Sequence, residues 1–318
     1  MAEALAGVAR LDPHKFHDPL VTVDGKRRAR VALGSLETLW FNTGTLCNLA
    51  CRHCYIESSP RNDRLAFLGV AEVAEFLDEI ERLRLGTRLI GFTGGEPFIN
   101  RDLPAMLECT LSRGFRALVL TNAMKPMHKM QPALLALRER FGDSLQIRVS
   151  IDHYGRAVHE AERGRRSWQP TLAGLCWLAA NGFAVSVASR RLSGESEGAI
   201  RHGFAGLFGA LGVAIDAADP VMLTVFPEMD AAADVPEISE SCWDLLGKSP
   251  DALMCASSRM VVRFKGAARP SVIACTLLPY DPRFNLGSSL AEALGSVALN
   301  HPHCARFCVL GGGACSRA

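Results

Sequence analysis

Two kinds of segment alternate along most of the chain. Short apolar runs of strand length separate longer segments in which apolar residues recur at helical spacing. In residues 70–85, for example, Val73, Phe76, Leu77 and Ile80 fall on one face of a helix. The pattern predicts six strands, the first beginning at residue 39 and the others over 88–92, 115–121, 145–151, 183–189 and 222–226, with helices over 70–85, 103–113, 132–141, 171–180 and 200–211.

Strands that alternate with helices in this way predict a parallel sheet covered by helices. Six units are fewer than the eight of a closed (β/α)8 barrel, so a partial barrel and a doubly wound sheet both fit. After residue 227 the alternation stops. The remaining chain predicts a helix near 238–246, a hairpin from 260–263 and 272–277, a short helix at 289–297 and a tail rich in Cys and Gly. We therefore divide the chain into an N-terminal extension (1–37), an α/β domain (38–230) and a small α+β domain (231–318).

Composition and charge narrow the class of protein. The chain is 48% hydrophobic and 21% charged, which is typical of a globular protein and not of a disordered one. A net charge of +2 gives no reason to expect nucleic acid as a partner. The N-terminus lacks the pattern of a secretory signal, and the longest uncharged stretch, 167–189, is interrupted by Pro170 and by the turn pair Asn181-Gly182. We expect a cytoplasmic protein without a membrane span, in which the basic run at residues 26–30 is a solvated edge.

The eleven cysteines are clustered rather than scattered. In the cytosol thiols stay reduced, so metal ligands or core residues are better interpretations than disulfides. Cys47, Cys51 and Cys54 lie within eight residues, in a loop after the first predicted strand. Such tight spacing suits an iron–sulfur cluster, and three ligands would leave one metal position open for chemistry. A zinc site completed by His53 or by a distant residue is the alternative.

A second motif follows the next strand, in the sequence Phe-Thr-Gly-Gly-Glu-Pro at residues 92–97. Gly94 and Gly95 allow the backbone to approach a ligand closely, and Glu96 could bind an amine or a hydroxyl group there. Taken alone, this motif would be a tight turn before a helix.

Together, the Cys-x3-Cys-x2-Cys motif and the Gly-Gly-Glu-Pro motif resemble the radical SAM superfamily over about residues 36–230. The resemblance implies a partial (β/α)6 TIM-like barrel in which Cys47, Cys51 and Cys54 bind a [4Fe–4S] cluster. The open iron of that cluster would bind the amino and carboxylate groups of S-adenosylmethionine. The resemblance assigns the rest of the cofactor site to His53 beside the adenine, to Gly94, Gly95 and Glu96 at the methionine amino group, and to Ser150, Asp152, Ser189 and Arg190 as polar groups from later strands.

Five further cysteines lie in the last 64 residues, at Cys255, Cys275, Cys304, Cys308 and Cys315. With the Gly-rich tail, this region resembles the SPASM/twitch extension of radical SAM enzymes. The resemblance implies one auxiliary [4Fe–4S] cluster held by four of the five cysteines, and the sequence leaves the choice of four open. Zinc is again the alternative, because it accepts the same ligands.

The resemblance implies an enzyme that takes one electron from a donor such as flavodoxin or ferredoxin and abstracts hydrogen from a substrate. A small polar molecule is the leading substrate class, because the twitch dehydrogenases of amino-sugar alcohols in this family are about as compact. Residues 1–37 are too short for the peptide-recognition module usual in peptide maturases, which makes a peptide substrate less favoured. A peptide maturase, or an iron–sulfur protein that only transfers electrons or senses, remains the alternative. Polar groups near predicted strand ends or the auxiliary region are candidate substrate contacts: His153, Tyr154, His159, Tyr280, Asp281 and Arg283.

Overall fold

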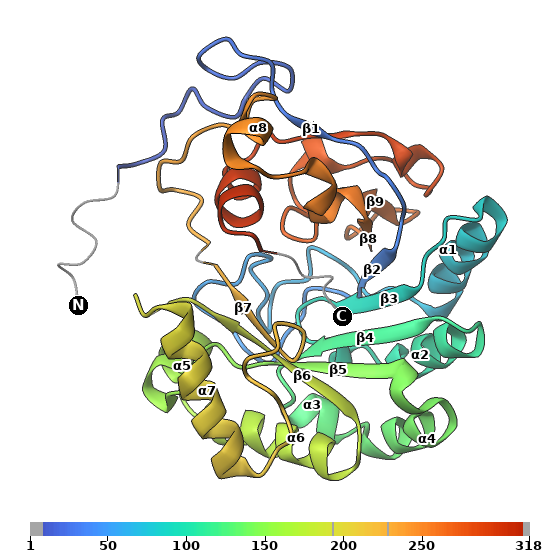
Figure 1. The fold of residues 1–318 in the computed structure, drawn as a ribbon. Coiled ribbons are helices and arrows are strands. Elements are labelled where there is room, and N and C mark those ends of the chain that lie inside the picture. The colour runs from blue at the N-terminus through green and yellow to red at the C-terminus, as the bar shows by residue number, and fades with distance from the viewer. Residues whose placement is uncertain (1–8, 193, 228, 314–318) are drawn as a thin grey trace.

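The six predicted strands form one parallel sheet in which each strand pairs with the next along the chain (Figure 1). The structure is a computed structural model that describes residues 9–192, 194–227 and 229–313. The sheet is open, with β7 at one edge and β9 at the other. This confirms a mixed α/β fold with an unclosed, barrel-like sheet. The strands are β2 (Thr38–Asn42), β3 (Leu89–Thr93), β4 (Arg116–Thr121), β5 (Leu145–Ser150), β6 (Ala184–Arg190) and β7 (Leu223–Phe226).

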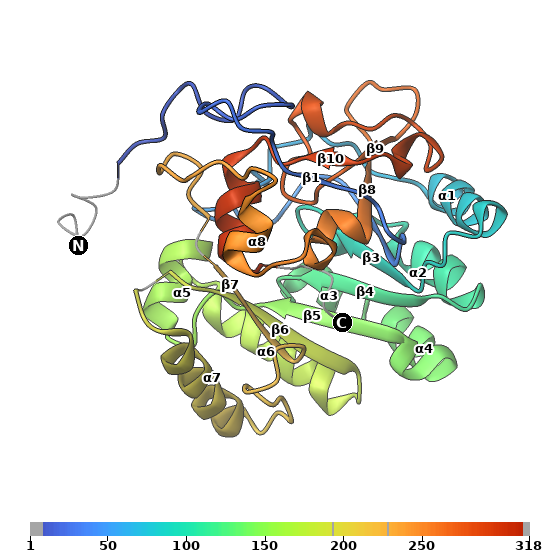
Figure 2. The same cartoon turned by 45° about the horizontal axis from the view of Figure 1, so that its top comes forward.

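Helices cover one face of this sheet in both views (Figures 1 and 2). The apolar stripe predicted for residues 70–85 is the buried face of the first helix, with Val73, Leu77 and Ile80 against the sheet. Two short helices, over residues 125–128 and 156–163, have too few apolar positions to show a period, and the sequence pattern does not predict them. The helices are α1 (Val70–Leu83), α2 (Leu103–Ser112), α3 (Lys125–His128), α4 (Gln131–Phe141), α5 (Arg156–Arg163), α6 (Trp168–Ala180) and α7 (Glu197–Leu211).

The C-terminal segment extends the same sheet. The predicted hairpin is present as β8 (Ser258–Val262) and β9 (Ser271–Ile273), and β8 also pairs in parallel with β2. Before it lies α8 (Cys242–Leu246), and after it a π-helix (Cys304–Leu310) that the sequence does not predict. Single 3-10 turns occur at Pro97–Ile99, Gly142–Ser144, Pro250–Ala252, Met254–Ala256, Pro282–Phe284 and Glu292–Leu294.

The prediction of a helix over residues 289–297 is wrong. Only a 3-10 turn forms there, and it is followed by β10 (Val297–Ala298), which pairs antiparallel with β1 (Arg30–Val31). The partner strand lies about 270 residues earlier in the sequence, so local periodicity carries no trace of it.

One hydrophobic core lies between the sheet and the helices that cover it. A second hydrophobic core lies on the opposite, inner face of the sheet. Trp40 on β2, Leu118 on β4 and Met260 on β8 are fully buried there, together with Phe16 from the N-terminal segment and Phe307 from the π-helix. Figure 2 shows the N-terminal segment (blue) and the C-terminal segment (orange to red) together on this side. The two ends of the chain therefore share one core with the sheet.

The basic run at residues 26–30 is not a uniformly solvated edge. Arg28 is 2% exposed, and its guanidinium lies 2.5 Å from the carboxylate of Glu237, itself buried. Arg27, by contrast, has an 82% exposed side chain. The expectation fails at Arg28 because its counter-charge comes from a residue 209 positions away, which no local pattern contains.

None of the helices in the described segments has the length and apolar character needed to span a bilayer.

Candidate functional site

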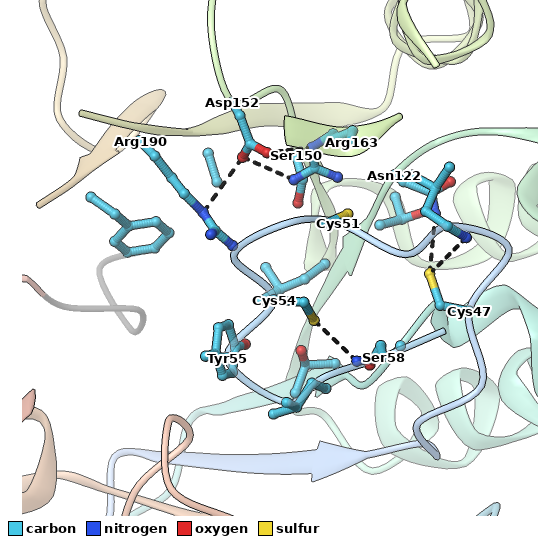
Figure 3. A pocket seen from close by; sticks show the side chains of 18 of the residues that line it. Cys47, Cys51, Cys54, Tyr55, Ser58, Asn122, Ser150, Asp152, Arg163 and Arg190 are labelled. Carbon is cyan, nitrogen blue, oxygen red and sulfur yellow. Dashed lines mark hydrogen bonds and ion pairs between the residues drawn. The ribbon is translucent and has the colours of Figure 1, made fainter. Parts of the chain in front are cut away.

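The carboxyl ends of β2 to β6 meet at an open cavity of about 990 Å³, its mouth included. In parallel α/β folds this edge is where ligands bind, because loops of independent sequence converge there. Figure 3 shows that the cavity is bordered on one side by the loop after β2 and on the other by the ends of β5 and β6. Most residues predicted for the cofactor site lie on these loops.

Cys47, Cys51 and Cys54 all line this cavity (Figure 3). The backbone N–H of Leu49 donates to the sulfur of Cys47 at 3.4 Å, and that of Ser58 donates to Cys54 at 3.3 Å. Such bonds favour thiolate over thiol, as the ligands of an iron–sulfur cluster require. The loop thus presents three sulfurs, two with backbone donors, to one space.

Burial governs the charge of these sulfurs in the metal-free protein. It raises the pKa of the Cys47 thiol to about 12, and it also raises the pKa of Cys51. Loading a cluster must therefore displace protons from these thiols, so assembly is linked to pH. Within the described ranges, no group of three His, Cys, Asp or Glu side chains is close enough to hold a metal ion. Three thiols spaced around an open cavity nevertheless suit the chemistry of a [4Fe–4S] cluster with one open iron.

Gly94 and Gly95 line the cavity where the loop after β3 crosses the cysteine loop. A Cβ on Gly95 would lie 2.3 Å from the carbonyl oxygen of Leu46, and one on Gly94 would lie 2.5 Å from that of Gly44. The N–H of Gly95 donates to the same Gly44 carbonyl at 2.8 Å. The glycines thus allow this loop to pack on the backbone that carries the cysteines, a contact that the motif by itself does not reveal.

Glu96 is buried and fastens this loop to the end of β4. Its carboxylate accepts hydrogen bonds from the Thr121 hydroxyl and the Asn122 N–H, both at 2.8 Å, and from the Phe98 N–H at 3.2 Å. The side chain is not among those that line the cavity, so its expected contact with the methionine amino group stays a prediction. Burial outweighs these donors and raises the pKa of Glu96 from 4.5 to about 7.

The raised pKa predicts how Glu96 affects stability with pH. Between pH 4.5 and 7 the folded protein holds a proton that the unfolded chain has lost, so stability falls as the pH rises through this window. We expect the metal-free wild type to lose on the order of 3 kcal/mol relative to Glu96→Gln between pH 5 and 8. Urea unfolding at a series of pH values measures this difference, and parallel profiles for the two proteins would contradict it.

The ends of β5 and β6 supply the predicted polar groups. Ser150, Asp152 and Arg190 line the cavity (Figure 3). Ser189 lines it too. The hydroxyl of Ser189 donates to the backbone carbonyl of Asp152 at 3.0 Å, and the Arg190 guanidinium lies 3.5 Å from the Asp152 carboxylate. Ser189 and Arg190 are therefore both linked to Asp152, and the contacts of all four residues with the cofactor stay a prediction.

Arg163, which the sequence did not single out, is linked to Asp152 as well. From α5 it forms two hydrogen bonds with Asp152, at 2.8 and 3.1 Å, and both side chains are buried. Burial opposes ionisation of Asp152, but the guanidiniums of Arg163 and Arg190 outweigh it and keep the pKa of Asp152 below its usual value. No local pattern marks Arg163.

Arg148 is a second lining residue that the sequence analysis missed. It is 1% exposed, and its guanidinium donates to the Ser186 hydroxyl at 3.1 Å. It precedes Ser150 by two positions, and alternation along a strand places both on the same face. The period-two pattern of residues 145–151 could therefore have identified it.

His53 is not among the residues that line the cavity. Its ring lies 2.5 Å from the carboxylate of Glu162, and its backbone carbonyl accepts a hydrogen bond from Arg190 at 2.6 Å. Tyr55, two positions later, does line the cavity (Figure 3). The expected position of His53 beside an adenine therefore stays a prediction, with its side chain held elsewhere. The six candidate substrate contacts are also absent from the lining: His153, Tyr154, His159, Tyr280, Asp281 and Arg283.

Four of the five C-terminal cysteines line a second cavity, of about 420 Å³ with its opening to solvent included. They are Cys255, Cys275, Cys304 and Cys308, whereas Cys315 lies outside the described residues. Burial raises the pKa of Cys255 to about 11 and that of Cys304 well above its usual value. The other lining residues are mostly apolar. An apolar cavity with four thiols fits a closed cluster or a structural zinc site.

The two cavities share a wall. Leu277 lines both of them, and the π-helix contributes Phe307 to the first and Cys308 to the second. The second set of cysteines therefore lies directly behind one side of the first cavity.

Comparison with known proteins decides the family. The profile of the Radical SAM superfamily matches residues 41–196, which include the three cysteines of the first cavity and the Gly-Gly-Glu-Pro motif. Residues 41–196 form a radical SAM domain. Members of this superfamily use a [4Fe–4S] cluster and S-adenosylmethionine, so these are the cofactors of the domain.

Two curated relatives of this radical SAM protein match over less than half of the chain. The antilisterial bacteriocin subtilosin biosynthesis protein AlbA of Bacillus subtilis is 30% identical over 144 residues, which is 45% of this chain and 30% of that protein. The mycofactocin maturase MftC of Mycobacterium ulcerans is 29% identical over 43% of this chain and 35% of that protein. The chain thus spans about a third of the length of these two relatives.

Solved structures confirm the fold of the radical SAM protein. SuiB of Streptococcus suis bound to S-adenosylmethionine has a TM-score of 0.57 at 11% identity, covering 80% of this chain and 63% of that one. Native anSMEcpe with bound AdoMet has a TM-score of 0.58 at 14% identity, covering 80% and 79%. At such identities the likeness concerns the fold.

Proposed function

We propose that this protein is a radical SAM enzyme that cleaves S-adenosylmethionine reductively and abstracts hydrogen from a substrate. The observation that carries this proposal is the convergence of Cys47, Cys51 and Cys54 with the Gly94-Gly95 backbone on one cavity. When bound, the cluster and S-adenosylmethionine supply a 5′-deoxyadenosyl radical, with one electron from a donor such as flavodoxin or ferredoxin.

The residues around the first cavity would have different roles in binding the cluster and S-adenosylmethionine. Cys47, Cys51 and Cys54 would hold the cluster, and the backbone at Gly94 and Gly95 borders the space for the methionine part of the cofactor. Glu96 fastens that backbone to β4 from behind. Ser150, Asp152, Ser189 and Arg190 offer hydroxyl and charged groups to the remainder of the cofactor, with Arg163 fixing the carboxylate of Asp152.

The second cavity would hold an auxiliary cluster on Cys255, Cys275, Cys304 and Cys308. Of the five C-terminal cysteines, these four share one apolar space. Leu277 would then separate that cluster from the substrate, close enough for the cluster to exchange an electron with it.

The wall of the first cavity favours an apolar group of a peptide over a small polar molecule. Phe226, Met229, Leu277 and Phe307 line it, and the rings of the two phenylalanines lie 5.7 Å apart. Burying an amino-sugar hydroxyl against such a wall leaves it without a hydrogen-bond partner, whereas an aliphatic or aromatic side chain fits. The names of AlbA and MftC, a bacteriocin biosynthesis protein and a maturase, agree with a peptide substrate.

Anaerobic assay of the reconstituted protein tests the proposal. The dithionite-reduced wild type should form 5′-deoxyadenosine from S-adenosylmethionine and hold two clusters, with about four iron atoms each. The matched control carries alanine at Cys47, Cys51 and Cys54 and should lose the activity and one cluster. Wild type that binds both clusters and forms no 5′-deoxyadenosine would instead indicate an electron-transfer or sensor protein.

The substrate class is tested in the same assay. Short acetylated peptides centred on Leu, Val, Phe or Tyr should increase 5′-deoxyadenosine formation, and glucosamine should not. Stimulation by glucosamine alone would favour the small polar substrate.

A further inference from the structure

The loop that follows Cys54 is held by the C-terminal segment, outside the radical SAM domain. The N–H of Ala66 donates to the Arg263 carbonyl at 2.7 Å, and the N–H of Lys265 donates to the Arg64 carbonyl at 2.9 Å. Together they form an antiparallel bridge between residues 65 and 264. The far end of the cysteine loop is therefore attached to the turn between β8 and β9.

Tyr280 attaches the same loop close to its cysteine. Its hydroxyl donates to the carbonyl of Ile56 at 3.0 Å, and Ile56 lies two residues after Cys54 and is 2% exposed. The guanidinium of Arg64 lies over the Tyr280 ring, 3.6 Å from its centre. Burial raises the pKa of the Tyr280 phenol, so this hydroxyl remains a donor at neutral pH. One side chain thus fixes the backbone beside a cysteine of the first cavity.

A single turn connects Tyr280 to the second set of cysteines. The N–H of Leu277 donates to the sulfur of Cys275 at 3.4 Å, and that of Leu278 donates to the Cys275 carbonyl at 3.4 Å. The turn closes with the N–H of Asp281 bonded to the Leu278 carbonyl at 3.3 Å. Five residues therefore lead from a sulfur of the second cavity to the phenol that binds the loop of the first, and Leu277 between them lines both cavities.

We propose that Tyr280 is a positioning residue that couples the two cysteine sites. A metal cluster bound through Cys275 would fix the turn over residues 275–281, and Tyr280 passes that constraint to the backbone after Cys54. Since coupling between two sites is reciprocal, each site stabilises the other. This inference rests on the proposed function, because it requires both sites to bind metal.

A double-mutant cycle tests the coupling. The second site is removed by Cys255→Ala with Cys304→Ala, which leaves residues 275–281 unchanged. The probe is the anaerobic rate at which a ferrous chelator removes iron from the first cluster, identified by its EPR signal and by the change of that signal on addition of S-adenosylmethionine. We expect removal of the second site to accelerate this loss by about fivefold or more in the wild type.

In the Tyr280→Phe background, removal of the second site should have little further effect on the rate of iron loss, because the hydrogen bond to Ile56 is already absent. The phenylalanine ring still lies over Arg64, so the substitution removes only that bond. Thr87→Val is the matched control: it removes a buried hydroxyl that donates to the Leu36 carbonyl at 2.6 Å, in neither cavity lining, and should behave like the wild type. Equal acceleration in the Tyr280→Phe and wild-type backgrounds would overturn the coupling. So would a second site that never binds iron. Two bound clusters without 5′-deoxyadenosine formation would refute the proposed enzyme and leave the coupling measurable.

Discussion

Gly95→Ala is expected to reduce S-adenosylmethionine cleavage by about 100-fold or more. The new Cβ would lie 2.3 Å from the Leu46 carbonyl oxygen and 2.5 Å from that of Thr45. Both are backbone atoms, so no side chain can rotate to relieve the overlap, and the segment leading into Cys47 must move. A displacement on the order of 1 Å at a reacting centre suffices for a loss of this size.

The measurements are iron content and 5′-deoxyadenosine formation in the reconstituted variant. Gly206→Ala is the matched control, since Gly206 lies inside α7 with no atom within 4 Å of the added Cβ. That substitution should leave activity unchanged and stabilise the protein by about 0.5–1 kcal/mol, because alanine favours a helix. Wild-type activity in Gly95→Ala would show that the cysteine loop tolerates displacement.

Arg28→Met should lower the free energy of unfolding by about 3–5 kcal/mol. The guanidinium of Arg28 donates to the Glu237 carboxylate and to three backbone carbonyls, those of Asp18, Val21 and Leu299. Removing it leaves a buried carboxylate without its counter-charge and takes a donor from three carbonyls. The N-terminal segment would then separate more easily from the C-terminal half.

Urea unfolding of the metal-free protein measures this effect. The control is Arg27→Met, at the neighbouring exposed residue, which pairs with Glu240 at 3.4 Å and should cost about 1 kcal/mol or less. The double variant Arg28→Met with Glu237→Met should recover much of the loss, because apolar side chains can replace a buried ion pair. Similar unfolding curves for Arg28→Met and Arg27→Met would show that the pair contributes little.

The local sequence pattern predicted the parallel sheet well, and for a physical reason. The strands of this sheet are largely buried, so they appear in the sequence as short apolar runs, whereas each long helix has one buried face and leaves a helical period. The pattern failed where burial depends on distant partners. The strand over Val297–Ala298 pairs with Arg30–Val31, and α5 has too few apolar residues to reveal itself.

In the site, too, local motifs were visible in the sequence, whereas contacts with distant residues were not. The spacing of Cys47, Cys51 and Cys54 and the Gly-Gly-Glu-Pro motif carried the resemblance that indicated the family, and that resemblance implied the cofactors. Thiol spacing alone left zinc open as well. The bonds of Glu96, which hold it behind the cavity lining, depend on the end of β4, 25 residues further on.

The sequence by itself determined the class of chemistry, the parallel sheet and the two groups of cysteines, since all of these depend on residue type and short-range spacing. Only the tertiary structure decided that Cys255, Cys275, Cys304 and Cys308 share a cavity and that Arg163 neutralises Asp152. Only the tertiary structure, too, brought Tyr280 to the loop of Cys54, 224 positions from its partner Ile56. These contacts join residues that are far apart in the sequence and that meet only in the folded protein, so no local period or spacing encodes them.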